Sequence, residues 1–194
     1  MSRIIQTEDR HYPSNAKELD ILIFPHPTLK TVAQEVTEFN QDLKDLCQNM
    51  LKTMYHAPGI GLAAPQIGLS QRIFVLDVDY ERKVLGDEDD GPVEIQHLSP
   101  QIFINPVITD RQGETTYEEG CLSIPGVHEE VKRSAQVEVR YQDVNGETHT
   151  LAADDLRAIC IQHELDHLNG ILFIEHLSRL KYNFIKKKFM KRKG

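Results

Sequence analysis

The segment His163-Glu164-Leu165-Asp166-His167 constrains this chain more than any other part of its sequence. On a helix, two histidines four positions apart project from one face, so both imidazoles can reach a single divalent cation. The glutamate after the first histidine would lie beside that cation, where it can accept a proton from water. Because the preceding residues 158–161 are apolar, the helix is expected to be buried, and its ionisable side chains then need a metal or a partner. The segment therefore predicts a buried metal-binding helix.

Composition limits the kind of protein that surrounds this helix. The chain has 194 residues, 40% hydrophobic and 27% charged, as expected of one globular domain spanning residues 1–194. No apolar run reaches the roughly 18 residues that span a bilayer, and the N-terminus lacks the apolar core of a signal peptide. We therefore expect a cytoplasmic protein with no membrane partner. Three cysteines without framework spacing argue against a disulfide scaffold.

The apolar pattern predicts an α+β fold, with mixed or antiparallel β-sheets around the central metal-binding helix and a further helix at the C-terminus. Helices are expected over 38–56 after a cap at Thr37, from Asp154 or Asp155 to about 168 with Gly170 as the stop, and over about 178–191. Strands are expected over 71–79, over 101–109 with an interruption at Pro106, and over 136–141, which an Asn145-Gly146 turn pairs with 148–151. Residues 80–97 are expected to form an acidic surface loop.

The last predicted helix is strongly basic. From Lys181 to Gly194 there are seven basic residues and no acidic ones, in a chain whose formal net charge is −8. A basic segment on an acidic body is suited to binding a polyanion. Cations also stabilise the C-terminal end of a helix, so the charge alone favours neither explanation.

A hydrolytic metal site usually has three protein ligands, so His163 and His167 need a third. The metzincin pattern would place a histidine at position 173, where this chain has Phe173, and that family is excluded. A downstream glutamate serves in thermolysin-like enzymes, but here the only downstream acid is Glu175, and no second helix is predicted to present it.

Two cysteines remain as candidates for the third ligand. Cys160 lies on the same helix, and three ligands on successive turns would be spread over about 10 Å, which strains a small coordination sphere. Cys121 lies between Gly120 and Pro125, in a turn suited to presenting a thiolate. Taken alone, however, a single cysteine of this kind is more often structural.

A third segment, Gly59-Ile-Gly-Leu-Ala-Ala-Pro-Gln66, combines glycines that permit close backbone approach to a ligand with a glutamine amide that can polarise a carbonyl. Together with Glu119-Gly-Cys-Leu-Ser123 and His163-Glu-Leu-Asp-His167, it resembles the three motifs of peptide deformylase, in the same order. The resemblance extends from about Ile21 to Leu180 and is weakest over 80–97. The uninterrupted Cys-Leu-Ser and the basic C-terminal helix resemble the bacterial type I branch.

The resemblance implies one divalent metal ion bound by Cys121, His163 and His167. Fe²⁺ is expected physiologically, with Zn²⁺, Ni²⁺ or Co²⁺ as alternatives in the isolated protein. It also implies that Glu164 accepts a proton from water and passes it to the leaving amine. The Gln66 amide and the backbone N–H of Leu122 are then the oxyanion donors.

The resemblance further implies an apolar pocket for a methionine side chain. Its lining residues would be Ile60, Leu156, Ile159 and Cys160, next to His163, while Gly61 pairs with the peptide backbone. Leu156 is explained equally well as a core residue. The sequence does not decide whether Glu119 and Asp166 orient the ligand histidines, or whether Arg133 pairs with Glu119.

The predicted function is thus removal of the formyl group from the N-terminal formylmethionine of nascent chains, with release of formate. The basic C-terminal helix would then bind the ribosome. One alternative is a metallopeptidase that cleaves internal peptide bonds. Another is a non-catalytic metal-binding module that docks on RNA, although a structural site has no need of a base such as Glu164.

Overall fold

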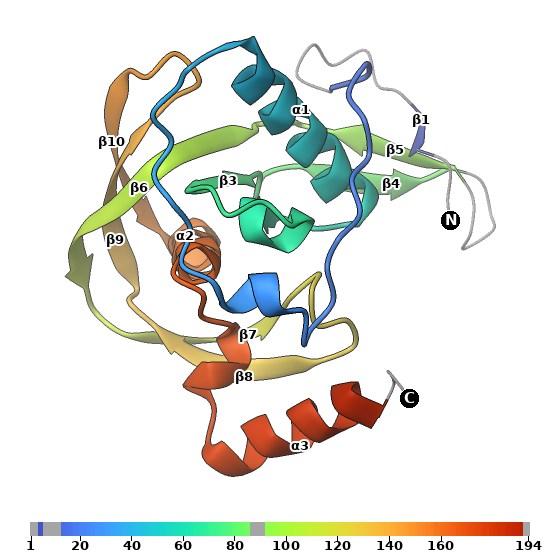
Figure 1. Ribbon diagram of the computed structural model, residues 1–194, viewed down its shortest axis with the longest axis vertical. Helices are drawn as coiled ribbons and strands as arrows, with labels where there is room; N and C mark the ends of the chain where they lie inside the picture. Colours follow the sequence, from blue (N-terminus) through green and yellow to red (C-terminus); the bar gives the residue numbers. More distant parts are fainter. Residues whose placement is uncertain (1–3, 6–12, 86–91, 192–194) are drawn as a thin grey trace.

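The structure, a computed structural model, describes residues 4–5, 13–85 and 92–191. Five strands form the main sheet in the order β10-β9-β6-β3-β2, with every neighbouring pair antiparallel (Figure 1). They are β2 Gly61–Ala63, β3 Ile73–Leu76, β6 Gln101–Gln112, β9 Gln136–Gln142 and β10 Thr148–Asp154.

Two smaller sheets flank the main sheet. One has the order β1-β5-β4, from β1 Ile4–Ile5, β5 Val93–Gln96 and β4 Glu81–Val84, and β1 runs parallel to β5. The other pairs β7 Thr115–Gly120 with β8 His128–Arg133. The helices are α1 Gln41–His56, α2 Asp155–Leu168 and α3 Arg179–Lys191, with short 3-10 turns at Pro27–Lys30, Ala64–Ile67 and Phe173–His176. The predicted α+β class with mixed and antiparallel sheets is confirmed.

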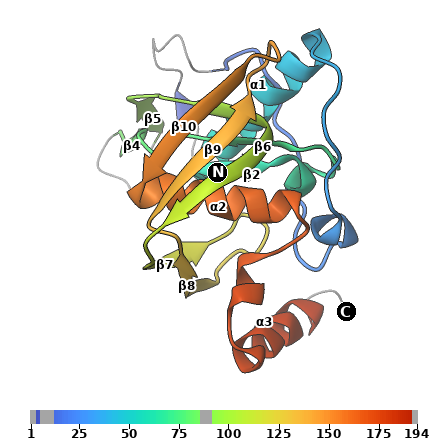
Figure 2. The same ribbon diagram turned by 90° about the vertical axis from the view of Figure 1, so that its left-hand side faces the viewer.

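Helix α2 lies at the centre of the fold. Figure 1 views it nearly end-on, with β6 and β9 to one side, α1 above and the β7–β8 hairpin below; in Figure 2 it lies across the strands. Ten of its 14 residues are buried, so almost its whole circumference is covered. On a helix that protein covers almost all round, an unpaired ionisable side chain is costly, so the ionisable residues of α2 need partners or a bound ion.

The position of α2 follows from a strand that is buried on both faces. Along β3, Ile73 and Val75 face a core cluster shared with α1, whereas Phe74 and Leu76 face a second cluster shared with α2. Alternate side chains of a strand point to opposite faces, so β3 holds the two helices on opposite sides of one sheet. A third cluster joins α3, through Ile185 and Phe189, to the 3-10 turn at Phe173–His176.

Several sequence-predicted boundaries were wrong, each for a local reason. Helix α1 begins at Gln41 because Asn40, not Thr37, caps it: the Asn40 side chain accepts a hydrogen bond from the Leu43 backbone N–H at 3.0 Å. Strand β3 ends at Leu76 because the Asp77 carboxylate accepts the backbone N–H groups of Asp79 and Tyr80, which turns the chain.

The strand around Pro106 and the predicted acidic loop also differ. Strand β6 continues through Pro106 to Gln112, accommodating the proline by a register shift between Ile104 and Val107. Residues 80–97 are not simply a loop, since they contain the paired strands β4 and β5; residues 86–91 lie outside the described part. The glycine-rich segment at 59–66 likewise contains the edge strand β2.

Other predicted features lie where the sequence placed them. Asp154 is the residue before α2, although its side chain makes no capping bond, and Gly170 follows the helix end with φ +70°. A Cβ on Gly170 would lie 2.7 Å from the Lys30 carbonyl oxygen, so glycine is required there for space as well as for backbone conformation. Among the described helices, none is both long and apolar enough to cross a membrane.

Candidate metal centre

Cys121, His163 and His167 lie together in the fold. Their ligand atoms are all within 4.8 Å of one another, and the Cys121 Sγ is 3.3 Å from His167 Nε2. The two histidines come from successive turns of α2, with ring centroids 5.0 Å apart. Cys121 follows β7 in a tight turn closed by a hydrogen bond from the Ile124 backbone N–H to the Cys121 carbonyl. The pairing of a turn with a buried helix thus assembles a thiol and two imidazoles from distant parts of the sequence.

This donor set fits a divalent metal ion. His163 Nδ1 is bound to Glu119, which leaves Nε2 as the ligand atom of that ring. The buried Glu164 Oε2, which lines the same cavity as Cys121 and His163, has no hydrogen-bond partner within the part of the chain that the structure describes. An unpartnered buried polar atom is rare, and here it marks a place for water or an ion. One soft thiolate and two imidazoles suit zinc or iron, and leave a fourth position open.

The two ligand histidines differ in their electrostatic surroundings. Burial, and then the neighbouring His163, hold the pKa of His167 well below its usual range, so it is neutral, as a metal ligand must be. Burial also lowers the pKa of His163, but hydrogen bonds to Cys121 and Glu119 outweigh it and hold that pKa well above its usual range. Positive charge is therefore favoured between Cys121 and His163, where a bound cation would supply it.

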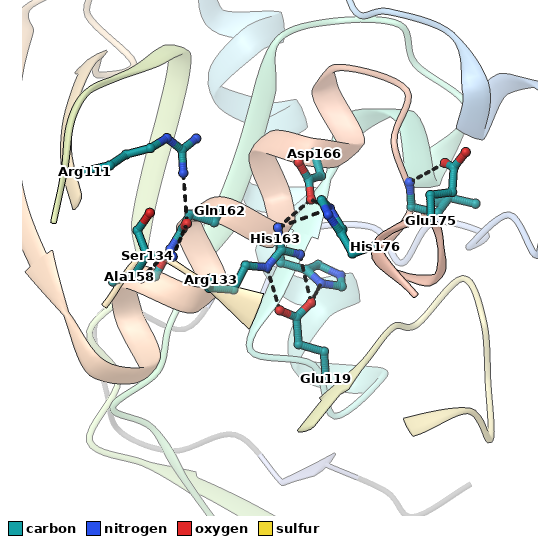
Figure 3. Close-up of polar contacts among 11 residues, drawn as sticks. Arg111, Glu119, Arg133, Ser134, Ala158, Gln162, His163, Asp166, Glu175 and His176 are labelled. Atoms are coloured by element: carbon teal, nitrogen blue, oxygen red, sulfur yellow. Dashed lines mark hydrogen bonds and ion pairs between the residues drawn. The ribbon is translucent and has the colours of Figure 1, made fainter. Parts of the chain in front are cut away.

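Glu119 orients His163. Its carboxylate accepts hydrogen bonds from His163 Nδ1 at 2.7 Å and from Arg133 Nε and Nη2 at 2.7 and 3.0 Å (Figure 3). Burial alone would raise the pKa of Glu119, but these donors lower it to about 2, so it is ionised. Asp166 instead contacts Arg133 Nη1 at 2.6 Å and His176 Nε2 at 2.7 Å. Glu119 therefore holds both Arg133 and His163, a predicted metal ligand, whereas Asp166 pairs with Arg133 and His176.

Glu164, on α2, lines the same cavity as Cys121 and His163 and is 3% exposed. Burial raises its pKa to about 7, which suits a group that takes and returns a proton near neutrality. A Cβ on Gly61 would collide with the Glu164 carboxylate and lie 2.9 Å from the Cys160 Sγ. Glycine at 61 is therefore required for the close approach of β2 to α2.

Gln66 presents its amide nitrogen to the centre. The Gln66 Oε1 accepts a hydrogen bond from the Ala63 backbone N–H at 2.8 Å, which fixes the orientation of the amide. The Nε2 atom then lies 3.5 Å from Cys121 Sγ and 3.2 Å from the hydroxyl of the buried Ser123, a contact that the sequence did not single out. Within the described residues, no hydrogen bond is found for the backbone N–H of Leu122, the other predicted donor.

A cleft of about 450 Å³ opens onto Glu164 and His163. All five predicted substrate-binding residues line it: Ile60, Gly61, Leu156, Ile159 and Cys160. Leu156 is half-buried and belongs to none of the three core clusters, which favours the pocket over the core explanation. Tyr117 and His128, which no sequence motif indicated, line the same cleft from the β7–β8 hairpin. That these residues bind substrate stays a prediction.

Comparison with known proteins identifies the family. The family model described as polypeptide deformylase matches residues 18–183. The chain belongs to the polypeptide deformylase family. It is 49% identical over 185 residues to a peptide deformylase of Erythrobacter litoralis, covering 89% of this chain and 95% of that protein. It is 45% identical over 174 residues to one of Neisseria meningitidis, covering 90% of this chain and 95% of that protein.

Solved structures agree with this assignment. A crystal structure of a peptide deformylase from Legionella pneumophila superposes with a TM-score of 0.77 at 38% identity, covering 91% of this chain and 95% of that one. The resemblance drawn from the three motifs is thus confirmed, and so is the enzyme class, a metal-dependent hydrolase of the deformylase family. Which metal the Cys-His-His site holds, and which residues act in catalysis, stay predictions.

Metal ligation can be tested with the two cysteines near the site. Cys121→Ser is expected to lower metal affinity by more than the roughly 10- to 100-fold typical of changes around a ligand, because a hydroxyl is a poor substitute for thiolate. Cys160→Ser, the same change beside the centre, should leave the metal bound. Metal-to-protein ratios after anaerobic reconstitution measure both. Metal lost from Cys160→Ser and kept by Cys121→Ser would contradict the assignment.

The raised pKa of Glu164 predicts a pH-dependent cost to the metal-free protein. The pKa of this carboxyl rises from 4.5 in the unfolded chain to about 7 in the folded protein. It does not lower the free energy of unfolding at low pH, where it is protonated in both states, but lowers it progressively as pH rises from 4.5 to 7. Glu164→Gln should therefore stabilise the metal-free protein by up to about 3 kcal/mol at pH 8, and much less at pH 5. Urea unfolding at both pH values measures this. The exposed Glu38→Gln serves as control, and equal gains at both pH values would refute the prediction.

Proposed function

We propose that the chain hydrolyses the N-terminal formamide of formylmethionyl peptides in the cytoplasm, using Glu164 as proton carrier and Gln66 and Leu122 as oxyanion donors. The observation that carries the proposal is the convergence of Glu164 and the Gln66 amide on the Cys-His-His centre within one cleft. A base beside a metal site and a donor aimed across it are the groups that acyl hydrolysis requires.

The chain's own residues account for the proton transfers. A divalent ion at the centre, Fe²⁺ by expectation, would lower the pKa of water to near neutrality and polarise the formyl carbonyl. Glu164 accepts the proton of the attacking water and delivers it to the amine as the carbon–nitrogen bond breaks. The Gln66 amide and the Leu122 N–H donate hydrogen bonds to the oxygen that becomes negative. The products are formate and a peptide with a free amino terminus.

The cleft is suited to an extended peptide that begins with an apolar side chain. Ile60, Leu156, Ile159 and Cys160 offer apolar surface for methionine. Gly61 lies on β2, the last strand of the main sheet, and among the described strands none pairs with its outer edge. A bound peptide can add to that edge through backbone hydrogen bonds.

Helix α3 supplies a basic surface for the ribosome. Its residues Lys186, Lys187, Lys188 and Lys191 are exposed, while Ile185 and Phe189 anchor the opposite face in the core. In Figure 1 the helix lies at the edge of the molecule, below the β7–β8 hairpin. Clustered lysines attract the RNA backbone in a salt-dependent way. Arg192 and Lys193 lie outside the described residues.

Formate release decides between the proposed function and its rivals. The metal-loaded chain should release formate from formyl-Met-Ala-Ser and leave internal peptide bonds of unformylated peptides intact. Glu164→Gln should lower kcat by about 10²- to 10⁴-fold with metal still bound, because proton transfer is lost. Enzyme-coupled formate assays and metal analysis measure this. Cleavage of internal bonds would support the metallopeptidase, and absence of all hydrolysis would support the non-catalytic module.

The ribosome proposal is tested by charge reversal on α3. Deleting the helix would uncover Ile185 and Phe189, so Lys187→Glu with Lys191→Glu is the cleaner change. Co-sedimentation with ribosomes should weaken at least about 10-fold at low salt, with the difference shrinking as salt rises. Lys44→Glu with Lys83→Glu, on α1 and β4, makes the same charge change away from α3. Equal binding by both double variants would rule out docking through α3.

A further inference from the structure

Gln162, one residue before the first ligand histidine, uses its buried amide completely. Its Oε1 accepts from Arg111 Nη1 at 2.9 Å and from the Ser134 backbone N–H at 3.0 Å. Its Nε2 donates to the Ser134 carbonyl at 2.9 Å and to the Ala158 carbonyl at 2.9 Å. An amide offers two donors and two acceptor sites, so none is left over. Gln162 thus joins helix α2 to the segment between β8 and β9, because it bonds both the N–H and the carbonyl of Ser134, as the backbone of a neighbouring strand would.

Arg133, the residue before Ser134, contacts helix α2 one turn after Gln162. Its Nη1 contacts Asp166, four residues after Gln162, while its Nε and Nη2 hold Glu119, the carboxylate that orients His163. Figure 3 shows Arg133 and Ser134 lying side by side against α2, with Gln162 and Asp166 pointing toward them. Two consecutive residues of one segment therefore contact two positions on one face of the helix.

The helix face that contacts Arg133 and Ser134 has a fixed angular relation to the face that carries His163 and His167. Gln162 and Asp166 precede His163 and His167 by one residue each, so the two pairs form adjacent stripes about 100° apart around the helix. Any rotation of α2 about its axis would carry both histidines away from Cys121, which belongs to a different element.

We infer that the Arg133-Ser134 dipeptide is a clamp that sets the rotation of α2, with Gln162 as a positioning residue for the metal ligands. Apolar packing alone fixes rotation poorly here, because α2 is buried on nearly all sides and apolar contacts are not directional. Hydrogen bonds are directional, and two of the four that Gln162 makes join α2 to the Ser134 N–H and carbonyl, which as backbone groups cannot rotate away. The inference rests on the metal site of the proposed function and adds a residue that touches neither metal nor substrate.

The test replaces Gln162 and reads the geometry of the metal site directly. Co²⁺-loaded full-length Gln162→Met, similar in volume but without hydrogen bonds to Ser134, should bind Co²⁺ about 10-fold more weakly and show an altered visible ligand-field spectrum. Gln162→Asn, one methylene shorter but still polar, provides a milder change of the same kind if the methionine variant does not fold. Chelator competition and absorption spectroscopy measure both effects without relying on catalysis.

Two controls separate positioning from general stability. Ser134→Ala keeps the backbone groups that Gln162 uses and should behave as wild type. Gln142→Met removes another internal amide, bonded to Asn105 and to the Gly146 carbonyl on the far side of the sheet, and should destabilise the fold without changing the Co²⁺ spectrum. A folded Gln162 variant with wild-type Co²⁺ affinity and spectrum would overturn the clamp. It would leave the proposed function untouched, since that is tested by formate release.

Discussion

The buried guanidinium of Arg133 is the interaction on which the rest of the centre depends. A cation in this position would be costly without counter-charges, and Glu119 and Asp166 supply two. Satisfying Arg133 therefore requires β7, β8 and α2 to meet at one point. The same requirement delivers Glu119 to His163, because one carboxylate accepts hydrogen bonds from both. One arrangement thus neutralises the charge of Arg133 and orients His163, a predicted metal ligand.

The apolar core explains why that arrangement is rigid. Strand β3 is buried on both faces, so α1 and α2 are held on opposite sides of a single sheet. This leaves α2 without a solvent-exposed face on which to place Glu164, His163 and His167. Burial in these surroundings raises the pKa of Glu164 to about 7. The exclusion of water also strengthens the hydrogen bond between Glu119 and His163.

Elements with a strong local pattern were predictable from the sequence. The length of α2, its glycine stop and the 136–142 strand follow from periodicity and turn residues, which act over a few neighbouring positions. Predicted boundaries were wrong where a side chain hydrogen-bonds the backbone and ends or begins an element, as Asn40 does at α1 and Asp77 does after β3. Strand β4 was missed because three of its four residues are charged, so it has no apolar alternation. Strand β5 does alternate, but over only four residues that follow an acidic segment.

The sequence alone determined the two histidines and the glutamate of α2, because their spacing on one helix is a local property. By resemblance it also indicated Cys121 and Gln66, which the fold brings to the same centre from the turn after β7 and from the 3-10 turn after β2. Only the tertiary structure decided that Glu119 orients His163, that Asp166 belongs to Arg133, and that Gln162 grips the backbone at Ser134. Those contacts join residues that are far apart in the chain. Sequence spacing does not indicate which buried donor meets which acceptor, because that depends on how the sheets and helices pack.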